Sequence, residues 1–188
     1  MLDKLAAYRN PVRLKDGEHV LLRPLLKEDK EALIRLFTSI SPEELPLMGD
    51  PLDIPREVAE WVDNLDYSHV FPLVAVTNGR IVGDATLHFR SGRYRHVAEV
   101  RVVLANDYRH RGLGHCMLRS LIDIAHGMGM KLLVAEVVAK QKDLLRALRA
   151  VGFEHQAILP DFIMAPNGMT HDVSLLTLSL EAAKGTEF

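Results

Sequence analysis

The chain has 188 residues, of which 48% are hydrophobic and 26% charged, which predicts one domain over residues 1–188 with its core at about 18–181. Its single cysteine excludes an intrachain disulfide. The sequence shows neither a secretory leader nor the roughly 18 apolar residues of a membrane span, so we expect a cytoplasmic protein. The formal net charge of −2 argues against nucleic acid as the main partner.

The first half of the chain predicts a strand, two helices and a hairpin. Apolar runs and helical spacings place these elements at residues 19–25, 27–37, 55–65, 71–77 and 80–89. Pro55 suits the first turn of the second helix, where no backbone N–H donor is needed. Asn78 and Gly79 separate the last two strands and are the strongest short signal for a hairpin.

The second half alternates strands and helices and ends in two strands. A strand, a helix, a strand, a helix and two strands are predicted at residues 96–104, 117–125, 131–139, 142–153, 153–159 and 172–180. The helix at 142–153 is stopped by Gly152. The order β-α-α-β-β-β-α-β-α-β-β predicts an α/β fold, in which a mixed sheet carries helices on both faces.

Two glycines, Gly112 and Gly114, lie between an apolar strand and an amphipathic helix, in the segment "RHRGLG". A strand, a glycine loop and a helix together offer unpaired backbone N–H groups and the positive end of a helix dipole, which suit a phosphate. The glycines could also serve only to turn the chain. Residues 90–119 hold seven arginines against two acids, which favours an anion site.

Three phosphate loops can be compared with this segment. A P-loop needs lysine and then serine or threonine where the chain has His115 and Cys116, and a dinucleotide loop needs a third glycine where it has Met117. The acyl-CoA pyrophosphate loop, Gln/Arg-x-x-Gly-x-Gly/Ala, fits at every fixed position from Arg109 to Gly114. With the element order and the later "VGF", this loop makes the chain resemble the GNAT superfamily of acyl-CoA-dependent N-acyltransferases.

The resemblance implies a fold with a wedge between two central strands, one ending at Leu104 and one at residues 132–139, which begin paired and then splay apart. Acetyl-CoA, the implied cofactor, would lie in this wedge with its pyrophosphate on the glycine loop. No metal is implied. The implied cofactor-binding residues are Val102, Val103, Leu104, Arg109, His110, Arg111, Gly112, Leu113, Gly114, His115 and Gln141.

Acetyl transfer to an amine needs a proton acceptor, and two glutamates stand in apolar strands where a carboxylate is unexpected. Glu99 matches a glutamate that protein-acetylating members of the superfamily carry before the loop, and Glu136 matches one in the ribosomal-protein acetyltransferases. We therefore expect Glu99 as the general base and Glu136 as its reserve. The alternative for each is a salt-bridged carboxylate, with Arg101 on the same strand face as Glu99.

The chain departs from the family pattern at Leu148, where many members place a tyrosine that protonates the leaving thiolate. Water, Tyr94 or Tyr108 would then have to supply that proton. The departure keeps a second function open, a non-catalytic module that binds acyl-CoA as a sensor.

The acceptor is expected to be a cationic primary amine, either a protein lysine or N-terminus or a small amine. Residues 43–66 hold eight acids against one arginine. A solvated helix face explains Glu57, Glu60 and Asp63. The proline-interrupted loop before the helix carries four further acids, Glu43, Glu44, Asp50 and Asp53, which would attract cations. A homodimer is left open.

Overall fold

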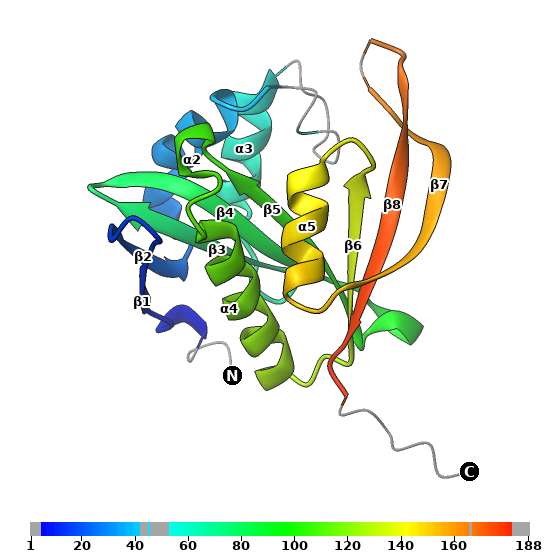
Figure 1. Ribbon diagram of the computed structural model, residues 1–188. Helices are drawn as coiled ribbons and strands as arrows, with labels where there is room; N and C mark the ends of the chain where they lie inside the picture. The colour runs from blue at the N-terminus through cyan, green and yellow to red at the C-terminus, as the bar shows by residue number, and fades with distance from the viewer. Residues whose placement is uncertain (1–4, 42–44, 46–52, 166, 182–188) are drawn as a thin grey trace.

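The protein is described by a computed structural model that covers residues 5–41, 45, 53–165 and 167–181 (Figure 1). Its central feature is an eight-stranded sheet in the order β1-β2-β3-β4-β5-β6-β8-β7. The strands are β1 (Asn10–Arg13), β2 (His19–Pro24), β3 (Val70–Thr77), β4 (Arg80–Phe89), β5 (Val97–Leu104), β6 (Leu132–Val138), β7 (Glu154–Met164) and β8 (Thr170–Ser179). Only the β5–β6 pair of this described sheet is parallel, so the α/β fold with a mixed sheet is confirmed.

Helices cover both faces of the sheet (Figure 1). The α-helices are α2 (Lys30–Thr38), α3 (Ile54–Asp63), α4 (Leu113–Gly127) and α5 (Lys142–Ala150), and the short 3₁₀ helices are η1 (Lys27–Asp29), η4 (Gly92–Tyr94) and η5 (Asn106–Tyr108). A Cβ on Gly83 of β4 would lie 2.8 Å from Met117 Sδ on α4. The next residue, Asp84, faces the other side and lines a cavity with Trp61 of α3. This alternation places α4 opposite the α2–α3 pair.

The hairpin between β3 and β4 forms as predicted. Thr77 pairs with Arg80 across a two-residue turn. Asn78 and Gly79 have φ angles of +49° and +73°, the left-handed backbone that a type I′ turn requires. The turn therefore sets the pairing next to it, at Thr77–Arg80 and Val76–Ile81, and the register of the two strands shifts between Val76 and Ala75.

The structure differs from the expected elements at both ends of the sheet. It adds β1, a four-residue edge strand whose Pro11 can be tolerated only because the strand lies at an edge. It also extends β7 to Met164, beyond the predicted end at residue 159. The β7–β8 register shifts between Leu159 and Ile163, and Asp161 has a φ of +50°, so the strand continues through an irregularity that no apolar alternation reveals.

The wedge implied by the resemblance is present between β5 and β6. The two strands pair only at Val97–Leu132, Ala98–Leu133 and Glu99–Val134. Beyond Glu99, β5 continues to Leu104 beside β4, while β6 continues to Val138 beside β8. The edge of β5 that faces the wedge therefore has no strand partner in the described residues.

None of the described helices is both long enough and apolar enough to cross a membrane.

Candidate active site

Two adjoining cavities open from the wedge. The first, about 640 Å³, reaches the glycine loop and is called the loop cavity; the second, about 260 Å³, lies over the sheet face below α2 and α3 and is called the sheet cavity. Both are lined by Val102, Val103, Gln141 and Leu144. Since these four residues border both spaces, a ligand in one cavity can meet a ligand in the other between β5 and α5.

The loop cavity is strongly basic. In the described part of its lining, one carboxylate, Asp143, stands against four lysine and arginine side chains and three histidines: Lys15, Arg109, Lys140, Lys142, His110, His115 and His171. Gly112 stands at the N-cap of α4 with a φ of +90°. The first turn of α4 therefore presents backbone N–H groups and the positive end of the helix dipole to the same space. This set of groups suits a ligand with several phosphates.

The loop cavity gathers nearly all of the expected cofactor-binding residues. Those that line it are Val102, Val103, Leu104, Arg109, His110, Gly112, Gly114, His115 and Gln141. Leu113 is fully buried in the core, and Arg111 lies outside the lining. Lys15, Lys140, Lys142 and His171 join the cavity from segments far from the loop in sequence, and no local motif marks them.

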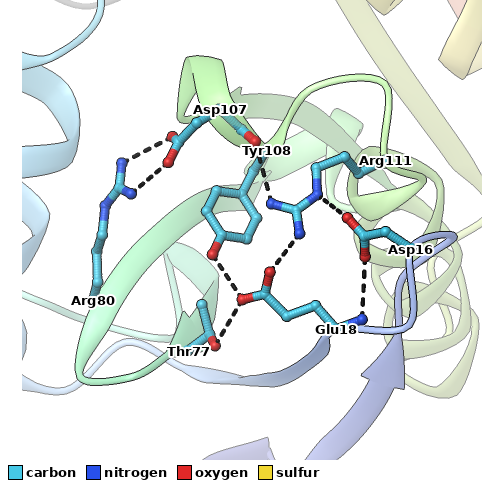
Figure 2. A network of polar contacts seen from close by, with 7 residues as sticks. All are labelled: Asp16, Glu18, Thr77, Arg80, Asp107, Tyr108 and Arg111. Atoms are coloured by element: carbon cyan, nitrogen blue, oxygen red, sulfur yellow. Dashed lines mark hydrogen bonds and ion pairs between the residues drawn. The ribbon is translucent and has the colours of Figure 1, made fainter.

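Arg111 binds two acids of the β1–β2 turn and does not line the loop cavity (Figure 2). Its guanidinium donates hydrogen bonds to Asp16 Oδ2 and Glu18 Oε2 and lies 4.3 Å from the centre of the Tyr108 ring. The bond from Arg111 lowers the pKa of the Asp16 carboxyl. Bonds from Tyr108 and Arg111 lower the pKa of the Glu18 carboxyl. The network fastens the start of the glycine loop to the N-terminal hairpin.

The two tyrosines expected as alternative acids lie away from the sheet cavity. The Tyr108 hydroxyl donates to Glu18 Oε1 at 2.8 Å inside this network (Figure 2). Tyr94 is 54% exposed and lines neither cavity. Leu148, where the family tyrosine was expected, is buried and lines the sheet cavity as an apolar side chain.

The two expected glutamates share an arginine but differ in their access to the sheet cavity. Arg101 Nε donates to Glu99 Oε1 at 2.8 Å, and Arg90 Nη2 lies 3.7 Å from Glu99 Oε2. The same Arg90 nitrogen lies 3.8 Å from Glu136 Oε1. Glu136 lines the sheet cavity, whereas Glu99 does not.

Asp84 is another acidic residue that lines the sheet cavity, and the sequence reasoning missed it. The residue is 4% exposed, and its Oδ1 has no hydrogen-bond partner among the described residues. Burial raises the pKa of Asp84 to about 7. The available signal was a lone acid in the otherwise apolar run "IVGDATL", a pattern that also drew attention to Glu99 and Glu136.

A neutral histidine continues the polar face of β4 beyond Asp84. His88 Nε2 lies 2.9 Å from Thr86 Oγ1, and both residues line the sheet cavity. Burial, together with the nearby Arg101, lowers the pKa of His88 to about 4. The imidazole is therefore uncharged at neutral pH.

The acidic segment expected to attract the acceptor is placed only in part. Glu43, Glu44 and Asp50 lie outside the described residues. Asp53 caps α3 by accepting a hydrogen bond from Arg56 N at 3.3 Å. Glu57, expected on a solvated helix face, lines the sheet cavity. The described lining of this cavity thus carries three carboxylates, Glu57, Asp84 and Glu136, against the single cation Arg101.

Within the described ranges, no three histidine, cysteine, aspartate or glutamate side chains come together as metal ligands.

Comparison with known proteins also points to an acetyltransferase. Residues 32–153 match the model of the acetyltransferase (GNAT) family. The acetyltransferase PA5475 of Pseudomonas aeruginosa is 26% identical over 147 residues, which cover 76% of this chain and 79% of that protein.

Two solved structures share the fold. An N-acetyltransferase from Staphylococcus aureus superposes with a TM-score of 0.76 at 22% identity, over 87% of this chain and all of that one. yncA from Salmonella typhimurium, whose structure holds its cofactor acetyl-CoA, superposes with a TM-score of 0.73 at 22% identity, over 88% of this chain and 96% of that one. The chain therefore belongs to the acetyltransferase (GNAT) family, whose members use acetyl-CoA, and the shared fold agrees with this assignment.

Proposed function

We propose that the protein transfers an acetyl group from acetyl-CoA to a cationic primary amine, such as a protein lysine, a protein N-terminus or a small amine. One observation carries this proposal. A basic cavity and an acidic cavity adjoin at the unpaired edge of β5. The basic side suits a polyanionic cofactor and the acidic side a cationic acceptor, so their meeting point is where transfer would occur.

The residues of the loop cavity fit acetyl-CoA. Lys15, Arg109, Lys140 and Lys142 offer cations for its phosphates, and the first turn of α4 offers N–H donors. The free edge of β5 at Val102 and neighbouring residues can pair with the amide groups of the pantetheine arm in the manner of an added strand. When bound, acetyl-CoA supplies the acetyl group as a thioester.

Glu136 is the glutamate we propose as general base for the attack. It lines the sheet cavity, where an acceptor amine would lie, and the arginine nearest to it is 3.8 Å away. Glu99 is instead hydrogen-bonded to Arg101, which lines the cavity. We propose that Glu99 positions this arginine at the cavity wall.

Binding and turnover of acetyl-CoA test the proposal together. Isothermal titration of the purified protein is expected to show binding of acetyl-CoA at concentrations below millimolar, with weaker or no binding of NAD. A panel of lysine peptides and small amines is then expected to yield an acetylated product, detected by mass spectrometry. Tight binding with no product from any amine would instead favour a non-catalytic acyl-CoA sensor, for which the apolar Leu148 is the supporting feature.

The charge of the acceptor is tested by salt. Because the described lining of the sheet cavity carries three acidic side chains against one guanidinium, kcat/KM for a lysine-bearing peptide is expected to exceed that for an amine substrate of zero net charge. It should also fall by about threefold between low and high ionic strength, as added ions screen the attraction. The amine substrate of zero net charge is the control, and its kcat/KM should show no such decrease. A preference for an acidic amine would contradict the cationic acceptor.

A further inference from the structure

Asp84 is a buried carboxylate for which neither the family resemblance nor the proposed base gives a role. Its Oδ1 is an acceptor atom with no donor among the described residues, and its side chain lines the sheet cavity. Most buried polar atoms in proteins have a partner, because leaving one unpaired is unfavourable. An unpaired acceptor on a residue that lines a cavity is suited to a ligand that brings the missing donor.

Asp84 lies beside the place where the two cavities meet. In the β4–β5 ladder it stands directly opposite Val103, and side chains in such a pair point to the same face about 5 Å apart. Val103 lines both the loop cavity and the sheet cavity. A group held at Asp84 is therefore next to the junction rather than at the far end of the sheet cavity.

Among the described residues, no side chain compensates the charge of Asp84. Its neighbours across the sheet are Val74 on β3 and Val103 on β5, both apolar. The other titratable side chains in the described lining of the cavity are Glu57 from α3, His88 from the same strand, Arg101 from β5 and Glu136 from β6. None of them gives Oδ1 a hydrogen bond. Burial alone accounts for the raised pKa of Asp84.

We propose that Asp84 is a further catalytic residue, which receives the ammonium group of the acceptor at the junction of the two cavities and takes its first proton. This role rests on the proposed function, because it requires an amine acceptor. Away from water, a neutral amine beside a neutral carboxyl is favoured over an ammonium beside a carboxylate. The burial of Asp84 thus promotes the deprotonation that the amine needs before it can attack.

The proposed steps account for both protons that the nitrogen loses. The first passes from the ammonium to an oxygen of Asp84 and later to water, leaving the nitrogen lone pair free. The nitrogen then forms a bond to the acetyl carbon, the carbon–sulfur bond breaks, and its electron pair leaves with the sulfur. The second proton passes from the nitrogen to Glu136 and from there to the thiolate, so no further reactant is needed.

Asp84→Asn tests this role with a lysine peptide and the same peptide carrying thialysine, whose amine is less basic. At pH 7 the substitution is expected to lower kcat/KM for the lysine peptide by about 10-fold. The loss should be smaller for thialysine and should shrink as the pH approaches the pKa of the free amine. In the unchanged protein, kcat/KM should rise through an apparent pKa near 7, and the variant should lack this step.

A merely structural role predicts different results. Asp123→Asn, the same change on the exposed face of α4, is the control and should behave as the unchanged protein. If Asp84→Asn kept the full kcat/KM and the same pH profile while still binding acetyl-CoA, the inference would be overturned with the proposed function intact. If the unchanged protein acetylated no amine, the proposed function itself would fail.

Thermal melting keeps the inference testable even if the variant loses activity for other reasons. The folded state keeps a proton on Asp84 up to about pH 7, whereas the unfolded chain loses it near the ordinary value of 3.8. The unfolded state therefore binds fewer protons between these values, and folding stability decreases as the pH rises. Asp84→Asn removes this decrease, so it should raise the melting temperature at pH 8. A lower melting temperature would show that the carboxylate is stabilised in the fold and would overturn the inference.

Discussion

Glu136→Gln is expected to lower kcat by about 100-fold while leaving the affinity for acetyl-CoA unchanged. Glutamine keeps the size and the hydrogen-bonding capacity of the side chain but cannot take a proton. Glu136 lines the sheet cavity and not the loop cavity, so the cofactor site should be undisturbed. Steady-state kinetics with a lysine peptide, combined with isothermal titration of acetyl-CoA, separate the two effects.

Glu99→Gln provides the comparison, because it changes a carboxylate that shares Arg90 with Glu136. Glu99→Gln weakens the hydrogen bond from Arg101 to residue 99, because the acceptor loses its charge. It is therefore expected to raise KM for the acceptor by less than about 10-fold, with a small change in kcat. Glu154→Gln, on the exposed start of β7, is the matched control. If kcat fell only in Glu99→Gln, the base would be Glu99; if it fell in neither variant, a water chain would be the better account.

The fold could be predicted from the sequence where local patterns decide it. The β3–β4 hairpin follows from Asn78 and Gly79, and β4 occupies the predicted residues, 80–89. The strand β1 could not be foreseen, because four residues that include a proline carry no periodic signal and become a strand only by pairing with β2. Its presence is a tertiary effect, which outweighs weak local propensity.

The residues of the functional site could likewise be predicted where they follow one another in sequence, and not where folding brings distant segments together. The glycine loop is contiguous in sequence, and nine of the eleven residues expected to bind the cofactor line the loop cavity. Lys15 comes from the turn between β1 and β2, and its side chain lies beside Gly112: a Cβ added to this glycine would be 3.4 Å from Lys15 Cγ. Residues brought together across such distances in the chain have no shared spacing for a motif to detect.

Arginine roles were the hardest to predict from composition. The excess of arginine around the loop indicated an anion site, yet Arg111, one residue from Gly112, is bound by Asp16 and Glu18. A local charge count treats every cation as available. The two acids that bind Arg111 lie more than ninety positions earlier in the chain.

Gly112→Val is expected to weaken acetyl-CoA binding by about 30-fold. Gly112 has a φ of +90°, which a β-branched residue adopts only under strain of about 2 kcal/mol. The added Cβ would also contact the Lys15 side chain, at 3.4 Å. The loop would relax away from the shape that presents its N–H groups, and binding would have to restore that shape. At about 1.4 kcal/mol for each factor of ten, this strain gives the expected loss.

Gly127→Val is the matched control, because it makes the same change near the other end of α4. A Cβ there meets nothing within 4 Å and requires no positive φ, and valine is more favourable than glycine within a helix. Isothermal titration should give the control the affinity of the unchanged protein, while thermal melting verifies that both variants are folded. Equal affinity in Gly112→Val and Gly127→Val would mean that the left-handed turn at Gly112 does not shape the phosphate site. Loss in Gly112→Val alone would locate the cofactor phosphates at the first turn of α4, where the exposed N–H groups and the cations of the loop cavity converge.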